Sequence, residues 1–147
     1  KYSKRAHNMN PRLYWQIHKL AFLLEKRADE NLKAQAGIGF AQFKVLEAIG
    51  SNMLAKQNLI ASQLDQTEAS ISRQIKILQK KGLISVASVM GNRRARELSL
   101  TEKGEELLLQ SVEILDMAQA QIIGALSYQE QRHFQELFER MLNKARQ

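Results

Sequence analysis

The sequence predicts a mainly α-helical fold with one small β-hairpin. Three observations lead to this prediction: apolar residues recur at helical spacing over most of the chain, one segment alternates at period two around a glycine turn, and helix caps and stops separate the segments. The 147 residues, 44% of them hydrophobic and 25% charged, suit one compact domain and exclude a disordered chain. The sequence has no internal repeat and no linker long enough to divide it.

The first part of the chain predicts one long helix and one short helix. Between about residues 9 and 33, apolar residues recur at helical spacing, and Asn10-Pro11 is a typical helix start. Gly37 and Gly39 interrupt this pattern. The apolar residues from Phe40 to Ile49 then predict a second helix.

Two further helices follow, with a tight turn between them. The third covers about residues 56–64, and three of its apolar residues are expected to face inward: Leu59, Ile60 and Leu64. Thr67 is a good N-cap for the fourth helix, which ends at Lys80-Lys81-Gly82. The apolar stripe of the fourth helix repeats at i, i+4 and i+7 and consists of Ile71, Ile75 and Leu78.

The hairpin and two more helices complete the chain. Residues 84–89 alternate at period two, Gly91-Asn92 is a turn pair, and residues 96–100 alternate again, which predicts an antiparallel hairpin. Thr101 opens a long helix. The segment from Ser127 to Glu130 has the pattern of a capping box and predicts the start of the last helix.

The basic charge of the chain is segregated. The formal net charge is +7; residues 1–33 and 67–100 each carry +5, whereas residues 34–66 are neutral and residues 101–147 carry −3. Such a surface favours a polyanion such as nucleic acid as partner. An anionic membrane, an acidic protein and a merely solvated face are the alternatives.

Composition restricts the chemistry and the compartment. The chain has no cysteine, which excludes disulfides, thiolate metal sites and catalytic cysteines. No apolar run approaches the ~20 residues of a membrane helix, and residues 1–10 are polar without a hydrophobic signal core, so we expect a cytoplasmic protein. Because the chain begins with Lys1 and not with methionine, we expect a few residues of the natural protein to precede it.

Three helices followed by a two-stranded hairpin make a winged helix-turn-helix, whose second central helix enters the major groove of DNA. Opposite its apolar stripe this helix is small at its start and basic beyond, and we expect near base edges Thr67, Ala69, Ser70, Ser72 and Arg73. Lys76 and Lys80 suit phosphates. The wing arginines, which suit a narrow minor groove, are Arg93, Arg94 and Arg96. Basic residues that serve only solubility are the alternative.

The segment Asn92-Arg93-Arg94-Ala95-Arg96-Glu97-Leu98-Ser99-Leu100-Thr101-Glu102-Lys103-Gly104 resembles the wing pattern D-x-R-x-x-x-V-x-L-T-x-x-G of the MarR family of bacterial transcription regulators. Residues 42–46 and 78–84 support the resemblance, which extends over nearly the whole chain. Asn92 departs from the family's aspartate and Leu98 from its valine. The neutral amide of Asn92 cannot pair ionically with a wing arginine, so we expect Arg94 to be less fixed before DNA binds.

The resemblance implies a homodimer in which a winged helix-turn-helix at about residues 38–101 is flanked by dimerisation helices at about 9–36 and 101–146. It also implies a ligand-responsive repressor that places two recognition helices about 34 Å apart on an inverted repeat. The expected interface residues are Leu13, Ile122, Ile123, Leu126, Phe134, Leu137, Phe138, Met141 and Leu142. An intrachain core made by the same residues is the alternative.

Regulators of this family often bind a small aromatic or anionic effector between the dimerisation helices and the winged part. The candidate pocket residues here are Tyr14, Trp15, His18, Phe22 and Phe43, with ordinary packing as the alternative. A metal-responsive regulator would need groups from distant helices to converge, namely His7, His18 and His133 with Glu25, Asp29 or Glu136. We expect no cofactor and no metal.

Catalysis and binding of an acidic protein are the remaining function classes. The chain has no phosphate-binding glycine loop, no nucleophile elbow and no paired carboxylates in an apolar setting, so we expect no enzyme. The expected function is sequence-specific binding of double-stranded DNA in transcription regulation. The competing class is a winged-helix protein-interaction module that binds an acidic partner through the same basic face.

Overall fold

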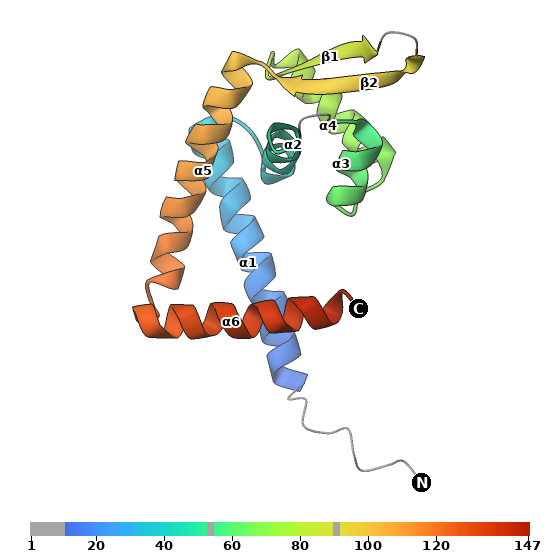
Figure 1. The fold of residues 1–147 in the computed structure, drawn as a ribbon. Coiled ribbons are helices and arrows are strands. Elements are labelled where there is room, and N and C mark those ends of the chain that lie inside the picture. Colours follow the sequence, from blue (N-terminus) through green and yellow to red (C-terminus); the bar gives the residue numbers. More distant parts are fainter. Residues whose placement is uncertain (1–10, 53–54, 90–91) are drawn as a thin grey trace.

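The computed structural model describes residues 11–52, 55–89 and 92–147, and for residues 11, 88, 89 and 92–96 it describes the backbone alone. The predicted helix start at Asn10 and the turn residue Gly91 lie outside the described residues. In the described part, helices and strands follow the predicted order (Figure 1). They are α1 (Pro11–Ala36), α2 (Phe40–Gly50), α3 (Gln57–Gln63), α4 (Glu68–Lys80), β1 (Ile84–Val89), β2 (Asn92–Leu100), α5 (Glu102–Ile123) and α6 (Tyr128–Ala145).

Local hydrogen bonds explain where the later helices begin and end. The hydroxyl oxygen of Thr67 accepts a hydrogen bond from the backbone amide three residues on at 3.2 Å, and that of Thr101 does the same at 3.1 Å. Ser127 and Glu130 form the reciprocal capping box. Gly82 follows α4 with φ of +72°, a left-handed conformation that glycine adopts without a Cβ penalty. These predicted caps and this predicted stop are confirmed.

The hairpin is attached to the helices at its base. β1 and β2 pair antiparallel, with Ile84 opposite Leu100. The backbone amide of Leu98 also donates to the carbonyl of Ala55 at 2.9 Å, so the segment before α3 adds a short bridge to β2. The base of the wing is therefore held by the same chain that leads into α3.

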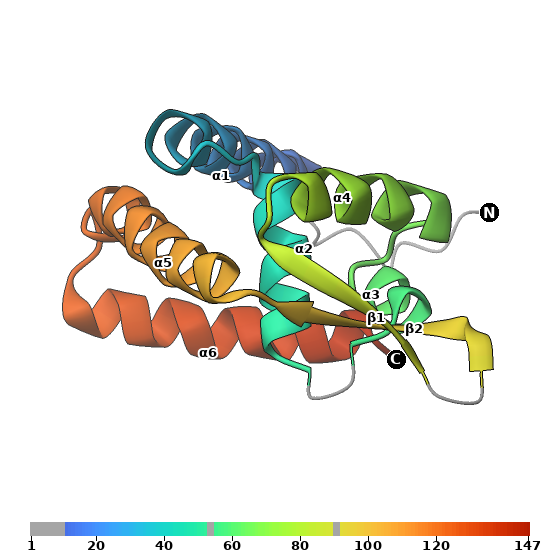
Figure 2. The same cartoon turned by 90° about the horizontal axis from the view of Figure 1, so that it is seen from above.

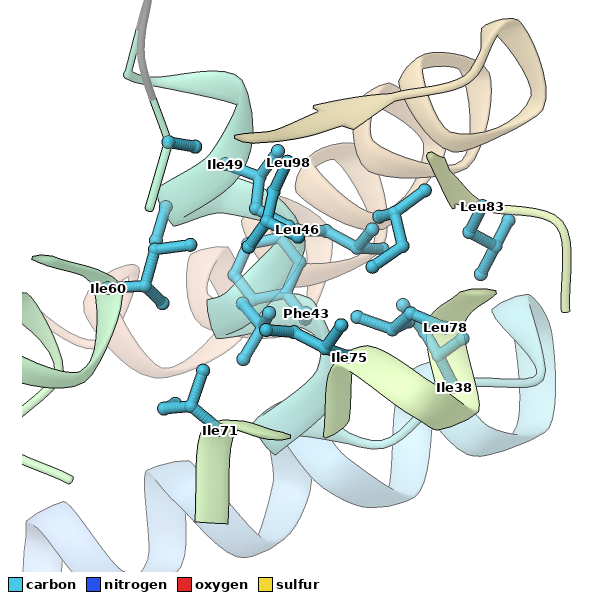
Figure 3. Close-up of a cluster of buried hydrophobic side chains, with 14 of the residues drawn as sticks. Ile38, Phe43, Leu46, Ile49, Ile60, Ile71, Ile75, Leu78, Leu83 and Leu98 are labelled. Atoms are coloured by element: carbon cyan, nitrogen blue, oxygen red, sulfur yellow. The ribbon is translucent and has the colours of Figure 1, made fainter. Parts of the chain in front are cut away.

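One hydrophobic core fills the winged part (Figure 3). It gathers side chains from α2, α3, α4 and the hairpin, among them Phe43, Leu46, Ile49, Ile60, Ile71, Ile75, Leu78, Leu83 and Leu98. Residues of α1 and α5 close this core from the other side, namely Ala28, Leu32, Ile114 and Leu115. The fold class predicted from the sequence, mainly helical with a small β-wing, is confirmed.

Leu59 corrects one detail of the predicted core. It was expected to face inward, but it is 52% exposed, whereas Ile60 is fully buried and Leu64 is half-buried. On a helix as short as α3 only one face touches the rest of the domain. Ile60 and Leu64 share that face at i and i+4, and Leu59 is rotated about 100° away from Ile60.

The two long helices and α6 extend beyond the winged part. α1 and α5 pack against each other and lead away from the hairpin, and α6 crosses at the far end of α5 (Figure 1). Seen from above, α6 and α1 lie on opposite sides of α5 (Figure 2). No residue of α6 is buried in this single chain. Of the described helices, none combines the length and the apolar character needed to cross a membrane.

Candidate nucleic-acid interface

The recognition helix of the winged part, α4, has two different faces. Its predicted inner stripe of Ile71, Ile75 and Leu78 is buried and points toward Phe43 of α2 (Figure 3). Its opposite face is exposed and carries the predicted residues Ala69, Arg73, Lys76 and Lys80. The inner stripe holds the helix against the core. The outer face is exposed, so it is accessible to a ligand as large as double-stranded DNA.

The hydroxyl groups at the start of α4 also hold the helix in place. The oxygen of Thr67 caps the helix by accepting from the amide of Ser70. The hydroxyl of Ser70 donates to Gln66 at 3.0 Å, and Ser72 is half-buried. Of the residues expected near base edges, Ala69 and Arg73 are exposed without such intrachain bonds in the described part, and Thr67 and Ser70 have a structural role as well.

The turn between α3 and α4 includes Asp65 and Gln66, the polar residues at which the sequence pattern predicts the end of the third helix. Asp65 has a positive φ of 51°, a conformation that aspartate tolerates better than most residues. The amide of Gln66 donates to the carbonyl of Ala61 at 2.9 Å, and the side chain of Gln57 reaches the carbonyl of Glu68 at 3.4 Å. These contacts set how α3 and α4 are oriented.

The charges of α4 are available to an anion. Arg73, Lys76 and Lys80 make no ion pair with any described residue. The ion pairs in the described part lie instead on α1 and between α1 and α2, as in the contact of Lys44 with Glu25 at 3.8 Å. A positive face without intramolecular counterions attracts phosphate groups from solution.

The wing lies at the end of the molecule away from α6, as α4 does (Figure 1). Ser85 and Ser99 lie opposite each other near its base, and their hydroxyl oxygens are 2.7 Å apart. The backbone of β2 includes the three predicted wing arginines, Arg93, Arg94 and Arg96, but their side chains lie outside the described residues. Their role stays a prediction.

Aromatic side chains gather on the first half of α1. The ring of Tyr14 lies 5.6 Å from that of Trp15 and 4.5 Å from that of His18, and Phe22 follows on the same helix. The rings of Trp15 and Phe22 are largely exposed. Phe43, the fifth residue of the predicted effector pocket, is buried in the core and stacks on Phe40 at 6.0 Å. In the single chain Phe43 is therefore part of the core, whereas Tyr14, Trp15, His18 and Phe22 are exposed on α1. The effector pocket stays a prediction.

Cavities at other places in the described part include one beside α1 and one beside β2. One, of about 360 Å³, lies between α1 and α5 and is lined by Arg27, Glu30, Asn31, Gln35, Ile114, Met117, Ala118 and Gln121. The other, of about 400 Å³, lies between the end of α2, β2 and the start of α5 and includes Leu98, Glu105 and Leu109. Neither contains the aromatic residues that the sequence analysis selected.

The residues predicted for the dimer interface are at the surface of the single chain. Ile122 is half-buried, and the others are exposed: Leu13, Ile123, Leu126, Phe134, Leu137, Phe138, Met141 and Leu142. Phe134 and Phe138 stack on each other at 5.6 Å. The alternative of an intrachain core made by these residues is wrong for α6, because the helix buries none of its side chains in this chain.

Asp29 ties α1 to the winged part, a role that the sequence analysis missed. Its carboxylate accepts a hydrogen bond from the backbone amide of Phe40 at 3.0 Å and lies 2.6 Å from the ammonium of Lys33. The hydrogen bond from Lys33, and then the one from the Phe40 amide, lower the pKa of Asp29 below its ordinary value. Because Gly39 at the N-cap of α2 has no side chain, Asp29 supplies the cap from another helix.

The residues considered for a metal site do not gather. Within residues 11–52, 55–89 and 92–147 no three histidine or carboxylate side chains lie together in a way that could hold a metal ion. Asp29 and Glu25 contact lysines, and His18 lies against Tyr14. His7 lies outside the described residues.

Comparison with known proteins agrees with this architecture. The profile of the family described as "Winged helix DNA-binding domain" matches residues 41–118, more than half of the chain. The transcriptional regulator HosA of Escherichia coli is 26% identical over 102 residues, which cover 69% of this chain and 76% of HosA.

Solved structures match over almost the full length. The chain superposes on Staphylococcus aureus MepR in a MepR–DNA complex with a TM-score of 0.77 at 22% identity, covering 89% of this chain and 96% of MepR. A putative MarR-like transcription regulator from Bacillus cereus gives a TM-score of 0.81 at 19% identity, covering 92% of this chain and 96% of that one. The family and the fold are those of DNA-binding regulators and not of enzymes. The chain therefore belongs to the winged helix DNA-binding domain family, and its architecture is that of a MarR-type transcriptional regulator.

Proposed function

We propose that this chain regulates transcription by binding double-stranded DNA in a sequence-dependent manner, as a homodimer on an inverted repeat. The observation that carries the proposal is the division of α4 into a buried apolar stripe and an exposed basic face that makes no ion pair with any described residue. A helix held in this way can enter the major groove without rearranging the core. The DNA in the MepR complex belongs to MepR, and it supports the same type of ligand here.

Individual residues of α4 suit different parts of the DNA. Ala69 is small and close to the helix start, so the backbone can approach base edges there. The guanidinium of Arg73 can donate two parallel hydrogen bonds to guanine, and the ammonium groups of Lys76 and Lys80 suit phosphates. The predicted wing residues, Arg93, Arg94 and Arg96, add contacts in an adjacent minor groove.

The proposal of a homodimer follows from α6. Its apolar residues line one side of an exposed helix, and a second copy of the chain would remove that surface from water. The first half of α1, which carries the exposed apolar residues Leu13 and Trp15, lies at the same end of the molecule as α6 (Figure 1). A two-fold dimer would present two α4 helices to two half-sites.

Ligand control is the third part of the proposal. A ligand between α1 and α5, or on the exposed aromatic residues of α1, would contact helices that both the dimer and the winged part share. Its binding would alter how the two winged parts are placed relative to each other and would release the DNA. The protein would then repress transcription without the ligand, and the ligand would end the repression.

Selection of bound duplexes from a random DNA pool at near-physiological salt tests the proposal. The expected result is an inverted repeat bound by two chains, with affinity at least about 10³-fold above that for random DNA. Recovery of no sequence, together with binding to an acidic protein partner, would replace the proposal by a protein-interaction module. The selected repeat then serves to screen small aromatic acids and other effectors for release of the DNA.

A further inference from the structure

Lys81, at the end of the recognition helix, differs from its neighbour Lys80. The ammonium of Lys81 donates a hydrogen bond to the carbonyl of Gly37 at 2.7 Å and reaches the side chain of Gln42 at 3.4 Å. Gly37 lies in the turn that joins α1 to α2. Lys80 makes no such contact in the described part and is exposed on the outer face. Both side chains are exposed, so the two adjacent lysines differ in their intrachain contacts and not in their exposure.

The backbone that follows α4 is also held by the start of α5. The ammonium of Lys103 donates to the carbonyl of Lys81 at 3.1 Å, and the hydroxyl of Thr101 donates to the carbonyl of Gly82 at 2.7 Å. The backbone amide of Thr101 donates to the carbonyl of Leu83 at 3.1 Å. Three consecutive carbonyls after the helix thus find donors in α5 or at its N-cap, where they would otherwise need water or a capping side chain.

Gly104 allows the close approach that this arrangement requires. A Cβ atom at position 104 would lie 2.0 Å from the carbonyl oxygen of Leu83, a distance that no side chain can adopt. Backbone of α5 therefore lies directly against the chain that leaves α4. We call the group of Lys81, Thr101, Lys103 and Gly104, with the carbonyls that they contact, the α4–α5 joint.

We infer that Lys81 and Lys103 are positioning residues that fix the angle of the recognition helix relative to α1 and α5. Lys81 links the end of α4 to the α1–α2 turn, and Lys103 links it to α5. In the proposed dimer, α1 and α5 belong to the part that joins the two chains. The α4–α5 joint would then set the separation of the two recognition helices, and with it the spacing between half-sites that the dimer accepts.

This inference rests on the proposed function. A lysine that positions α4 and a lysine that binds a DNA phosphate should affect DNA binding differently. A lysine that binds a DNA phosphate contributes to the salt dependence of binding, whatever the spacing of the half-sites. A lysine that positions α4 contributes to the discrimination between correct and incorrect spacing and leaves the salt dependence unchanged. Lys80, adjacent in sequence and exposed, is the matched comparison.

The experiment uses the full chain and the selected inverted repeat, with versions whose half-site spacing is changed by one or two base pairs. Affinities are measured at several salt concentrations for wild type, Lys81→Met, Lys81→Arg, Lys103→Met and Lys80→Met. For Lys81→Met and Lys103→Met we expect the preference for the correct spacing to fall about fivefold or more, the lower end of typical couplings between sites, with an unchanged salt slope. Lys81→Arg should restore most of the preference.

Lys80→Met should show the opposite behaviour, with a salt slope reduced by about two, one for each chain of the dimer, and an unchanged spacing preference. The inference is wrong if Lys81→Met loses salt slope as Lys80→Met does and keeps its spacing preference. Circular dichroism and the melting temperature show whether each variant is folded. If Lys81→Met does not fold, Lys103→Met tests the α4–α5 joint independently. If wild type selects no inverted repeat, the proposed function fails and the inference fails with it; if wild type selects one and both variants keep its spacing preference, only the inference fails.

Discussion

The winged part and α6 use apolar residues in opposite ways. In the winged part, side chains from α2, α3, α4 and the hairpin bury one another, and Leu46, Ile60 and Leu78 are fully buried. In α6 an equally regular stripe that includes Phe138 and Leu142 remains exposed, and no residue of the helix is buried. The same helical periodicity therefore produces a closed core in one region and an open surface in the other, and only the first is satisfied within one chain.

The largest effect is expected from a core substitution in the winged part. Leu46→Ala removes most of a fully buried side chain and leaves a cavity, so the free energy of unfolding should fall by about 2–5 kcal/mol. Urea denaturation at a fixed protein concentration measures this change. Leu59→Ala is the control, because Leu59 is exposed and its loss should cost much less. Equal costs for the two variants would mean that α3 does not pack as described.

The next effect concerns the open surface of α6. Phe138→Ala should weaken the proposed dimer by about 2 kcal/mol or more, roughly thirtyfold in dissociation constant, because large aromatic residues at the centre of an interface dominate its energy. Sedimentation equilibrium gives this constant. Tyr128→Ala, which removes an exposed aromatic side chain away from the stripe, should leave the dissociation constant within about twofold. If the wild-type protein is monomeric, the apolar stripe of α6 is not a dimer interface and must have another partner.

The third prediction compares two cations of α4. Arg73→Ala should cost about 1–3 kcal/mol for each half-site of the selected repeat and relax the base preference at one position of each half-site, because a guanidinium that reads guanine discriminates between bases. Lys76→Ala should weaken binding to selected and random DNA alike. Fluorescence anisotropy on both kinds of duplex separates the two roles. Equal losses for Arg73→Ala on both would show that Arg73 contacts phosphate and not bases.

The smallest expected effect is on the free energy of unfolding, from loss of the Asp29 contacts that link α1 to the winged part. The contacts of Asp29 with Lys33 and with the Phe40 amide lower its folded-state pKa, so they stabilise the protein at pH values above the unfolded value of about 4. This contribution is lost as the pH falls through the folded-state pKa. Since the carboxylate is partly exposed and screened by solvent, we expect only about 0.5 kcal/mol.

Asp29→Asn tests this link. The difference in unfolding free energy between wild type and Asp29→Asn should be constant from pH 7 to about pH 5 and should shrink below about pH 4. Denaturation by urea at each pH measures it. Lys26→Met, which removes a lysine from an exposed ion pair with Glu30 on the same helix, serves as the control for charge changes on α1. A difference that grows on acidification would contradict the assigned direction of the pKa shift.

Much of the fold was predictable because its signals are local. Thr67, Thr101 and Ser127 cap helices through amides three residues away, and the stripe of α4 repeats every three or four residues. Leu59 shows where this reasoning is weak: on a short helix, apolar character alone does not say which residues face the core. Phe43 shows the same for a site, because an aromatic residue suits a pocket and a core alike, and the sequence does not say that its side chain is buried here.

Local sequence patterns specify the elements, their order, the basic outer face of α4 and the apolar stripe of α6, since each depends on residues within a few positions of one another. The three-dimensional packing brings Asp29 of α1 to the start of α2 and Lys81 to Gly37 across 44 positions of sequence. It also decided that the stripe of α6 finds no cover within one chain. Contacts between distant segments depend on how whole helices pack, and no local pattern of charge or hydrophobicity specifies that packing.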